Sequence, residues 1–351
     1  MKNNKTKIAI IAPFPPPFGG MTVLAETLNK SLKKHKQSVI TIDTNPKVFG
    51  NKKGIIYKFL QLIVFVYNLR KIINYDYYII ISSSGNYFYT KALPVLLIGK
   101  IFKKRVVLDF VGGGVIDMIN NGNTRIIYWI KKFNQVIVPT TIFKDAFEKV
   151  GISSKIFPHI VNISRFSEAK TNTNTPVFLA AKNLEKYSNV ASLIRAFAEI
   201  KKIKPKATFL IAGDGPEKKN LINLVNELNV SGVEFLGNKS YDEMPKLFSE
   251  ATIFLHGTQI ESFGIVLIEA MASKTPIIST NVGGIPNIIT HDYNGLLVNF
   301  DDYMSISKLA IELINDNEKY NRITNNALET SKKYSIDILT PKLISLIQET
   351  K

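Results

Sequence analysis

Two glutamates, Glu261 and Glu269, show the clearest chemical pattern in this chain, because they stand eight positions apart around a predicted helix start. The apolar residues 251–255 predict a short buried strand, and the Ala- and Met-rich residues 265–272 predict a helix that begins near Phe263. Glu261 is therefore expected in the loop between them. At a rise of about 1.5 Å per residue, Glu269 is expected one to two turns along the helix.

The start of that helix has the chemistry of an anion site. The first amides of a helix have no partner inside it, and here they belong to Ser262, Phe263, Gly264 and Ile265. Such free donors suit a diphosphate. A carboxylate beside a diphosphate accepts hydrogen bonds from sugar hydroxyls, which are neutral donors. One interpretation is a nucleotide-sugar site; the alternative is an ordinary strand, loop and helix with two exposed glutamates, as most α/β proteins have.

Strand and helix patterns alternate along the whole chain, which predicts an α/β fold with parallel sheets covered on both faces. Besides the strand before Glu261, strands are expected at 8–12, 39–43, 77–82, 106–109, 135–139, 177–181, 208–212, 233–236 and 276–279, and helices at 55–70, 190–201, 217–228 and 336–348. The turn-rich segment 167–176 ends in proline and is expected to link two halves. No strict G-x-G-x-x-G follows the first strand of either half, so a dinucleotide dehydrogenase is not expected.

Composition bounds the class of protein. A chain of 351 residues with 45% hydrophobic residues can fill two cores of ordinary size. There is no cysteine, so disulfides and thiolate metal sites are excluded. The four histidines, His35, His159, His256 and His291, are scattered without ligand spacing, and no metal is expected. The apolar run 8–12 is too short for a signal peptide, which predicts a first strand and a cytoplasmic protein.

The excess of positive over negative charge lies entirely in the first half of the chain. Residues 1–170 hold 26 Lys and Arg against 8 Asp and Glu, a net charge of +18, whereas residues 171–351 hold 19 against 20. A lysine-rich composition alone would act on both halves alike. Basic and apolar residues interleave in segments 52–71, 96–105 and 125–133, as expected for a face that rests on anionic lipid.

The basic and apolar segments have two alternative interpretations besides a lipid face. Nucleic acid is another partner for a basic surface, but no recognised reader motif accompanies it, so nucleic-acid binding is not expected. The helix at 55–70 is alternatively a helix buried in the fold. A membrane span is excluded for the uninterrupted apolar stretch 62–67, which is far shorter than the ~20 residues that a span requires.

Several ordered motifs identify a family resemblance. The sequence ESFG-x4-EAMA (261–272), followed by GGIP (283–286) and NGLLV (294–298), closely resembles the donor-binding region of family 4 retaining glycosyltransferases. The resemblance implies the GT-B fold, in which two doubly wound Rossmann-like domains enclose a cleft. We expect an acceptor-side domain at 1–167, a nucleotide-sugar-binding domain at 168–335, and a helix at 336–351 that crosses back to the first domain.

The resemblance also implies roles for individual residues. Glu261 would hold hydroxyls of the donor sugar, and Glu269 would hold the ribose hydroxyls. The diphosphate would lie against Lys182 and the Gly19-Gly20 turn, with main-chain contributions from Ser262, Phe263, Gly264 and Ile265. The turn Gly213-Asp214-Gly215-Pro216 would serve as scaffold.

The chain departs from the family pattern at four places. Lys182 stands where the family usually has arginine, and a lysine lacks the bidentate fork of a guanidinium. The family lysine aligns with Tyr187, so the adjacent Lys186 either replaces it or one cation is missing. Asn287 stands where glutamate is more frequent. The usual acceptor-side histidine is absent. Asp109 and Asp117, near Gly112 and Gly113, are the candidate substitutes; the alternative is that each is a structural or solvated residue.

The implied activity is the retaining transfer of a sugar from a nucleoside diphosphate sugar, with UDP expected as the nucleotide. The expected acceptor is a lipid-linked glycan at the inner face of a membrane, as in bacterial-type surface polysaccharide or lipopolysaccharide assembly. No cofactor is expected. The alternatives are a non-catalytic GT-B partner that recruits a transferase to the membrane, and a nucleotide-sugar epimerase.

Overall fold

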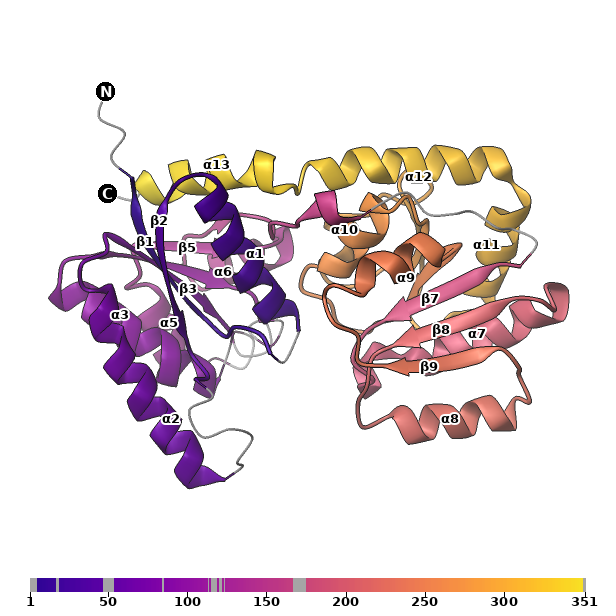
Figure 1. Cartoon of the computed structure of the whole chain (residues 1–351), viewed down its shortest axis with the longest axis horizontal. Helices are drawn as coiled ribbons and strands as arrows, with labels where there is room; N and C mark the ends of the chain where they lie inside the picture. Colours follow the sequence, from indigo (N-terminus) through magenta and orange to yellow (C-terminus); the bar gives the residue numbers. More distant parts are fainter. Residues whose placement is uncertain are drawn as a thin grey trace. The chain divides into compact units, whose positions relative to one another are not determined.

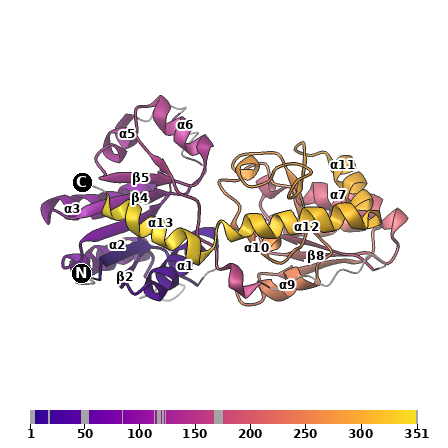
Figure 2. The same ribbon diagram turned by 90° about the horizontal axis from the view of Figure 1, so that it is seen from above.

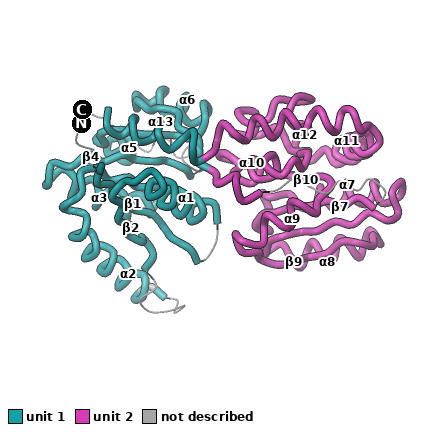
Figure 3. Tube along the Cα trace, turned by 45° about the horizontal axis from the view of Figure 1, so that its top comes forward, with its two compact units in different colours: residues 1–160, 336–351 teal, residues 161–335 magenta. Residues whose placement is uncertain are grey.

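The computed structural model describes residues 5–16, 19–46, 54–83, 85–112, 114, 119, 122, 124–166 and 175–349. The chain divides into two compact units, residues 1–160 with 336–351 (unit 1) and residues 161–335 (unit 2), as Figure 3 shows in two colours. Each unit contains a parallel six-stranded sheet flanked by helices (Figure 1), so the expected α/β class is confirmed. The expected linker begins at 167, whereas the units divide after Ile160; residues 167–174 lie outside the described residues.

Unit 1 is built on strands in the order β2-β1-β3-β4-β5-β6. Their bounds are β1 Lys7–Ala12, β2 Ser38–Asp43, β3 Tyr77–Ser82, β4 Arg105–Phe110, β5 Gln135–Val138 and β6 Lys155–Ile156. Parallel strands are covered on both faces, which is why β1 and β3 read as nearly continuous apolar runs instead of alternating ones. The helices are α1 Gly20–Lys34, α2 Ile55–Asn68, α3 Leu93–Ile101, α5 Thr124–Ile130, α6 Thr141–Lys149 and α13 Ile336–Gln348, with a short 3-10 helix η1 Leu69–Ile72 and a short π-helix η2 Phe88–Ala92.

One group of helices packs on each face of this sheet. Phe65 of α2, Val95 of α3 and Ile126 of α5 pack in one core cluster with Tyr78 and Ile80 of the sheet. On the other face α1 contacts α13, and Figure 2 shows α13 running across the strands of unit 1 beside α1. The outer sides of α2, α3 and α5 therefore belong to one side of unit 1.

The last helix is tied to unit 1 along its length. Lys34 of α1 forms an ion pair with Asp337 at 2.6 Å. At the other end of α13, Gln348 Nε2 donates to Thr6 Oγ1 at 2.8 Å. Leu343 is buried between these points. Residues that are last in the sequence thus complete the core of the first unit.

Unit 2 has strands in the order β12-β11-β10-β7-β8-β9. Their bounds are β7 Val177–Ala181, β8 Thr208–Ala212, β9 Val233–Gly237, β10 Ile253–His256, β11 Ile277–Thr280 and β12 Leu296–Val298. The helices are α7 Val190–Ile203, α8 Lys218–Glu227, α9 Met244–Glu250, α10 Ile265–Ala272, α11 Tyr303–Asn315 and α12 Asn317–Lys332, with short turns η3 Ile163–Arg165, η4 Lys186–Ser188 and η5 Ile285–Asn287.

The strand orders define a switch point in each unit. In unit 2 the chain runs outward from β7 through β8 and β9, then returns to the other side of β7 with β10. The loops after β7 and β10 therefore leave the sheet in opposite directions and open a crevice at the carboxyl ends of these strands. In unit 1 the equivalent point lies between β1 and β3. Ligand-binding groups are expected at these two places.

Candidate functional site

Three chemically active side chains meet at the switch point of unit 2. Lys182 directly follows β7, His256 is the last residue of β10, and Glu261 lies in the loop before α10. Lys182 Nζ lies 2.9 Å from Glu261 Oε2, and His256 Nε2 lies 3.5 Å from the same oxygen. Two predicted site residues, Lys182 and Glu261, are thus brought into direct contact although 79 positions separate them.

Burial and the neighbouring charges fix the protonation states of this cluster. Burial by itself would raise the pKa of Glu261, but the contact with His256 and the positive charge of Lys182 lower that pKa well below its ordinary value. Glu261 is therefore ionised at neutral pH. Burial and the nearby Lys182 lower the pKa of His256, so its imidazole is neutral. The cluster presents one carboxylate that can accept hydrogen bonds and one ammonium that can bind an anion.

Thr258 orients the ammonium group of the cluster. Its Oγ1 accepts a hydrogen bond from Lys182 Nζ at 2.9 Å. The loop that carries Thr258 is fixed from both sides, because Thr280 Oγ1 donates to the Thr258 carbonyl at 2.6 Å and the Gln259 amide donates to the Tyr187 carbonyl at 2.7 Å. Tyr187, at the place of the family lysine, thus contributes its main chain to the site. Lys186 is exposed at the start of η4.

Two glycine motifs hold the main chain on which the cluster stands. A Cβ atom at Gly213 would lie 2.0 Å from the carbonyl oxygen of Lys182, and one at Gly283 would lie 2.1 Å from the carbonyl oxygen of Glu261. Gly284 donates its amide to that same Glu261 carbonyl at 2.8 Å. The GDGP and GGIP motifs therefore position Lys182 and Glu261 through close backbone packing.

The start of α10 differs in detail from the sequence expectation. The helix begins at Ile265, two residues later than expected, because Gly264 has a left-handed φ of 94° and acts as its N-cap. The Ser262 amide is engaged, since it donates to Glu261 Oε1 at 3.1 Å. Phe263 is buried with its ring 5.6 Å from that of Tyr334, so its side chain anchors the loop. The helix start therefore offers its donors from Gly264 onward.

Glu269 lies on the buried side of α10. Burial raises its pKa to about 8, and the positive charge of Arg165 opposes this increase. Arg165 itself is held by Asp242 at 2.6 Å and by the Tyr241 carbonyl at 3.0 Å. The second glutamate of the pair is therefore a protonated or partly protonated acid near neutral pH, unlike Glu261.

The residues predicted in unit 1 fall into two environments. Gly19 and Gly20 lie after β1 at the switch point, and a Cβ atom added at either position would meet no atom of the described residues within 4 Å, so no described side chain covers this main chain. Gly112 follows β4 and is half-exposed. Gly113 and Asp117 lie outside the described residues.

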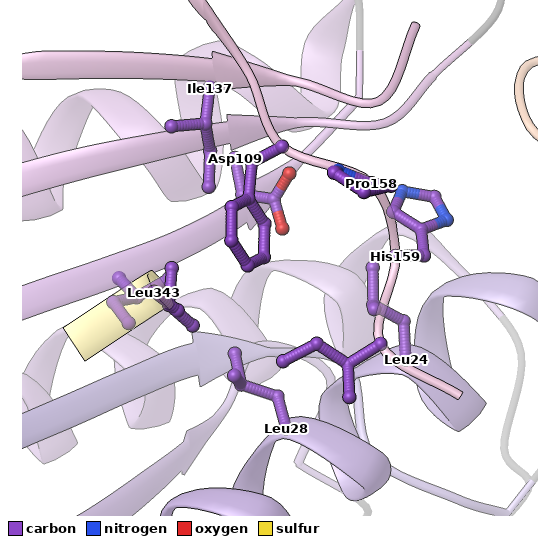
Figure 4. A pocket seen from close by; sticks show the side chains of 10 residues that line it. Leu24, Leu28, Asp109, Ile137, Pro158, His159 and Leu343 are labelled. Atoms are coloured by element: carbon purple, nitrogen blue, oxygen red, sulfur yellow. The ribbon is translucent and has the colours of Figure 1, made fainter. Parts of the chain in front are cut away.

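Asp109 does not lie on a surface. It is buried on β4 and borders a cavity of about 10 Å³, close to the smallest that holds one water molecule. Figure 4 shows its carboxyl oxygens directed toward Pro158 and His159, with Leu24, Leu343 and other apolar side chains around the cavity. Among the described residues its Oδ1 has no hydrogen-bond partner, and burial raises its pKa to about 7. This placement offers an acceptor no direct contact with Asp109.

The site contains two further residues that the sequence motifs do not indicate, His256 and Thr258. His256 Nε2 lies 3.5 Å from both Lys182 Nζ and Glu261 Oε2, and Thr258 bonds Lys182 Nζ at 2.9 Å. A usable signal existed, because His256 is a polar residue at the carboxyl end of an otherwise apolar strand, where α/β sheets carry their functional groups. Within the described ranges no group of three His, Cys, Asp or Glu residues is placed to hold a metal ion.

Comparisons with known proteins identify the family of this unit. Residues 163–330 match the family described as glycosyl transferases group 1. Unit 2 is a glycosyltransferase domain of this family. The matched residues include Lys182, Glu261 and Glu269, so the resemblance that their motifs indicated is confirmed.

Relatives of this glycosyltransferase domain have different acceptors. The N-acetyl-alpha-D-glucosaminyl L-malate synthase of Bacillus anthracis is 35% identical over 155 residues, which are 44% of this chain and 40% of that protein. A GDP-mannose-dependent monoacylated alpha-(1-6)-phosphatidylinositol monomannoside mannosyltransferase of Corynebacterium glutamicum is 32% identical over 196 residues, half of each chain. These alignments thus span half or less of each relative.

A solved structure extends the likeness to both units. Anabaena HepE, in a crystal structure with UDP and glucose, superposes with a TM-score of 0.78 at 19% sequence identity, covering 98% of this chain and 100% of HepE. The likeness concerns the fold, and it confirms the expected GT-B class for the whole chain.

Proposed function

We propose that the protein is a retaining glycosyltransferase that moves a sugar from a UDP-sugar to a lipid-linked glycan acceptor at an anionic membrane surface. A bacterial-type surface polysaccharide or lipopolysaccharide pathway would use such a reaction. The observation that carries the donor half of the proposal is the contact between Lys182 and Glu261 at the switch point of unit 2. The part of the proposal that concerns the acceptor is supported by the net positive charge of the first half of the chain.

The Lys182–Glu261 pair is suited to exchange partners when a donor binds. The ammonium group would leave the carboxylate for the diphosphate, where it stabilises the negative charge that develops as the glycosidic bond breaks. Glu261, ionised and released from Lys182, would accept hydrogen bonds from hydroxyls of the donor sugar. Main-chain amides from Gly264 and Ile265 would add donors for the diphosphate.

The reaction follows from this placement. The bond between the anomeric carbon and the diphosphate oxygen breaks, and the acceptor hydroxyl attacks the same face of the sugar, so the anomeric configuration is retained. The proton of the acceptor hydroxyl passes to the departing phosphate oxygen. No metal or cofactor is proposed, because Lys182 and the helix amides supply the positive charge.

The relatives support this choice of substrates. The mannosyltransferase of C. glutamicum is named for a nucleotide-sugar donor and a phosphatidylinositol-based acceptor, which is both lipid-linked and anionic. HepE has been crystallised with UDP and with UDP-glucose, and its fold is shared over 98% of this chain. UDP is therefore the nucleotide proposed, with GDP as the first alternative in any donor panel.

Release of nucleoside diphosphate from a panel of nucleotide sugars tests the proposal. We expect Glu261→Ala to lower kcat by about 10²–10³, as when a group that stabilises the transition state is removed. Glu234→Ala, which changes an exposed glutamate on β9, is the matched control and should keep wild-type turnover. Full turnover by Glu261→Ala would overturn the assignment of the site.

The same panel separates the alternatives. A non-catalytic partner would release no nucleotide, and its melting temperature would not rise with any nucleotide sugar. An epimerase would convert the donor without an acceptor, which product analysis detects. A transferase requires acceptor for sugar transfer and is stabilised by its donor.

A further inference from the structure

Helix α2 has an apolar side that the fold leaves uncovered. Its inner side is anchored by Phe65, which is fully buried, and by Leu62, which packs against the same core. Its outer side carries five large hydrophobic residues with 45–69% of their surface exposed: Ile56, Phe59, Ile63, Val66 and Tyr67. We call these five residues the α2 stripe.

The spacing of the α2 stripe places it on one side of the helix. Its members recur at intervals of three and four residues, which is the repeat of a helix surface. A surface helix ordinarily carries charged and polar residues opposite its buried side. Helices that are apolar on all sides occur inside large cores or in contact with lipid. We therefore expect the α2 stripe to be covered by a binding partner that is not part of unit 1.

The charges around α2 indicate what kind of partner this is. No aspartate or glutamate occurs between Thr44 and Asp76, whereas Lys58 lies within the helix and Arg70 and Lys71 follow it. The Arg70 guanidinium stacks 3.8 Å over the ring of Tyr67. An aromatic ring with a cation beside it suits the boundary between acyl chains and head groups, because one part is apolar and the other remains hydrated.

Neighbouring helices extend this surface with the same composition. On α3 and the turn after it, Leu97, Ile101 and Phe102 are exposed next to Lys100 and Lys103. On α5, Tyr128 is 55% exposed, and the ammonium of Lys132 lies 4.8 Å from its ring centre. All three helices pack inward on one core cluster and face outward on one side of unit 1 (Figure 1).

We propose that α2 lies in the interface of an anionic bilayer, with the α2 stripe inserted between acyl chains and the flanking cations at the level of the phosphates. The helix has 14 residues, or about 21 Å, which is shorter than the ~30 Å hydrocarbon core. Among the described helices none is long and apolar enough to cross a bilayer. An orientation parallel to the membrane plane satisfies both observations.

Anionic lipid explains the surface better than a second copy of the chain. Two copies that paired through the α2 stripe would bring like charges together at Lys58, Arg70 and Lys71, which is unfavourable. Lipid phosphates instead complement these cations and accommodate the apolar residues below them. The inference deepens the membrane part of the proposed function, but it rests on the surface of unit 1 and not on the chemistry of the donor site.

Flotation with vesicles tests the proposal on the full chain. We expect the wild type to partition onto vesicles of phosphatidylcholine and phosphatidylglycerol, and Phe59→Ser with Ile63→Ser to weaken partitioning at least tenfold. The matched control is Ile203→Ser, which removes a residue that is 60% exposed at the end of α7 in unit 2, and it should bind as the wild type does. Equal partitioning of all three proteins would overturn the proposal.

Fluorescence locates the inserted residue. The chain has one tryptophan, Trp129, so Trp129→Phe provides a silent background. In that background Phe59→Trp should be quenched by brominated lipids and Ile203→Trp should not. Absence of quenching at position 59 in vesicle-bound protein, or a lipid-free dimer that the double serine variant dissociates, would overturn lipid insertion.

The rate of nucleoside diphosphate release tests the proposed transferase activity independently of membrane insertion. The α2 stripe variants should release nucleoside diphosphate from a nucleotide sugar at the wild-type rate with a water-soluble acceptor, because these residues lie outside the donor cluster. If no nucleotide sugar is turned over while vesicle binding depends on the α2 stripe, only the proposed transferase activity fails.

Discussion

In the proposed function, the donor chemistry depends most directly on Lys182. Its ammonium bonds Thr258 and Glu261 at 2.9 Å each, although the family pattern has arginine at this position. We expect Lys182→Met to reduce kcat by about 10²–10³, because the leaving diphosphate loses its cation. Lys182→Arg should retain much more activity, since the charge remains, and steady-state kinetics with the preferred donor compare the two. Equal loss in both variants would contradict a purely electrostatic role.

Glu269 should make stability depend on pH. Its pKa rises from 4.5 in the unfolded chain to about 8 in the fold, so the folded state favours the protonated acid. Stability is therefore highest below about pH 4.5 with respect to this group and falls as pH rises toward 8. We expect Glu269→Gln to be more stable than the wild type by an amount that grows over this range, on the order of a few kcal/mol at pH 8.

Denaturant unfolding at several pH values measures this effect. The raised pKa of Asp109 also makes the free energy of unfolding fall as pH rises. The wild type is therefore compared with Glu269→Gln at each pH, so that the contribution of Asp109 cancels. Glu234→Gln changes an exposed glutamate and should show a constant difference from the wild type. Parallel stability profiles for the wild type and Glu269→Gln would contradict the raised pKa.

The sequence indicates which residues lie at the candidate site better than it indicates whether their side chains are protonated. The family motifs assigned Lys182 and Glu261 to one site, and the structure places their side chains in contact, because both follow strands that meet at a switch point. The opposite protonation of Glu261 and Glu269 was not predictable, since it depends on Lys182 and His256 near one carboxylate and on apolar burial of the other. Burial of Asp109 beneath α1 and α13 likewise depends on packing that a single strand pattern does not specify.

At the scale of elements, the GGIP turn should control Glu261 through its backbone. Gly283 has a φ of 53°, and a Cβ there would lie 2.1 Å from the Glu261 carbonyl oxygen. We expect Gly283→Ala to displace the loop and to reduce donor affinity and turnover about tenfold or more, since small misplacements of catalytic groups are costly. Isothermal titration with the donor and steady-state kinetics measure the two effects.

Gly237→Ala is the matched control for the Gly283→Ala variant. Gly237 also has a positive φ, 67°, but an added Cβ would meet no atom within 4 Å in the part of the chain that the structure describes. The Gly237→Ala variant should be less stable than the wild type because of backbone strain, but its affinity for the donor should stay near that of the wild type. A similar loss of affinity in both variants would show that strain, and not the close contact with Glu261, is responsible.

Elements differ in how well their sequence predicts them. The strands β3, β7 and β8 and the helix α13 have the predicted bounds, because apolar runs between turn residues leave little choice of register. The start of α10 was placed two residues early, since the left-handed cap at Gly264 is a local backbone choice. The exposure of α2 could not be settled from hydrophobicity, because core and lipid select the same side chains.

At the scale of the whole molecule, the last helix should contribute to unit 1 and not to unit 2. Removal of residues 336–351 would uncover the apolar surface beneath Leu339, Leu343 and Ile347, which are at most 4% exposed. We expect this truncation to lower the unfolding temperature of unit 1 and to leave unit 2 unchanged. Hydrogen exchange read separately on β3 and β10 distinguishes the two units, and equal loss of protection in both would contradict the prediction.

The dependence of unit 1 on α13 also constrains how the protein is made. Residues 1–160 leave the ribosome long before residues 336–348, whereas unit 2 is continuous in sequence. Domains generally fold as units during synthesis, and an incomplete unit exposes apolar surface that favours aggregation. Unit 2 should therefore reach its native state first, and the nascent first unit should be the natural client of a chaperone until its closing helix emerges.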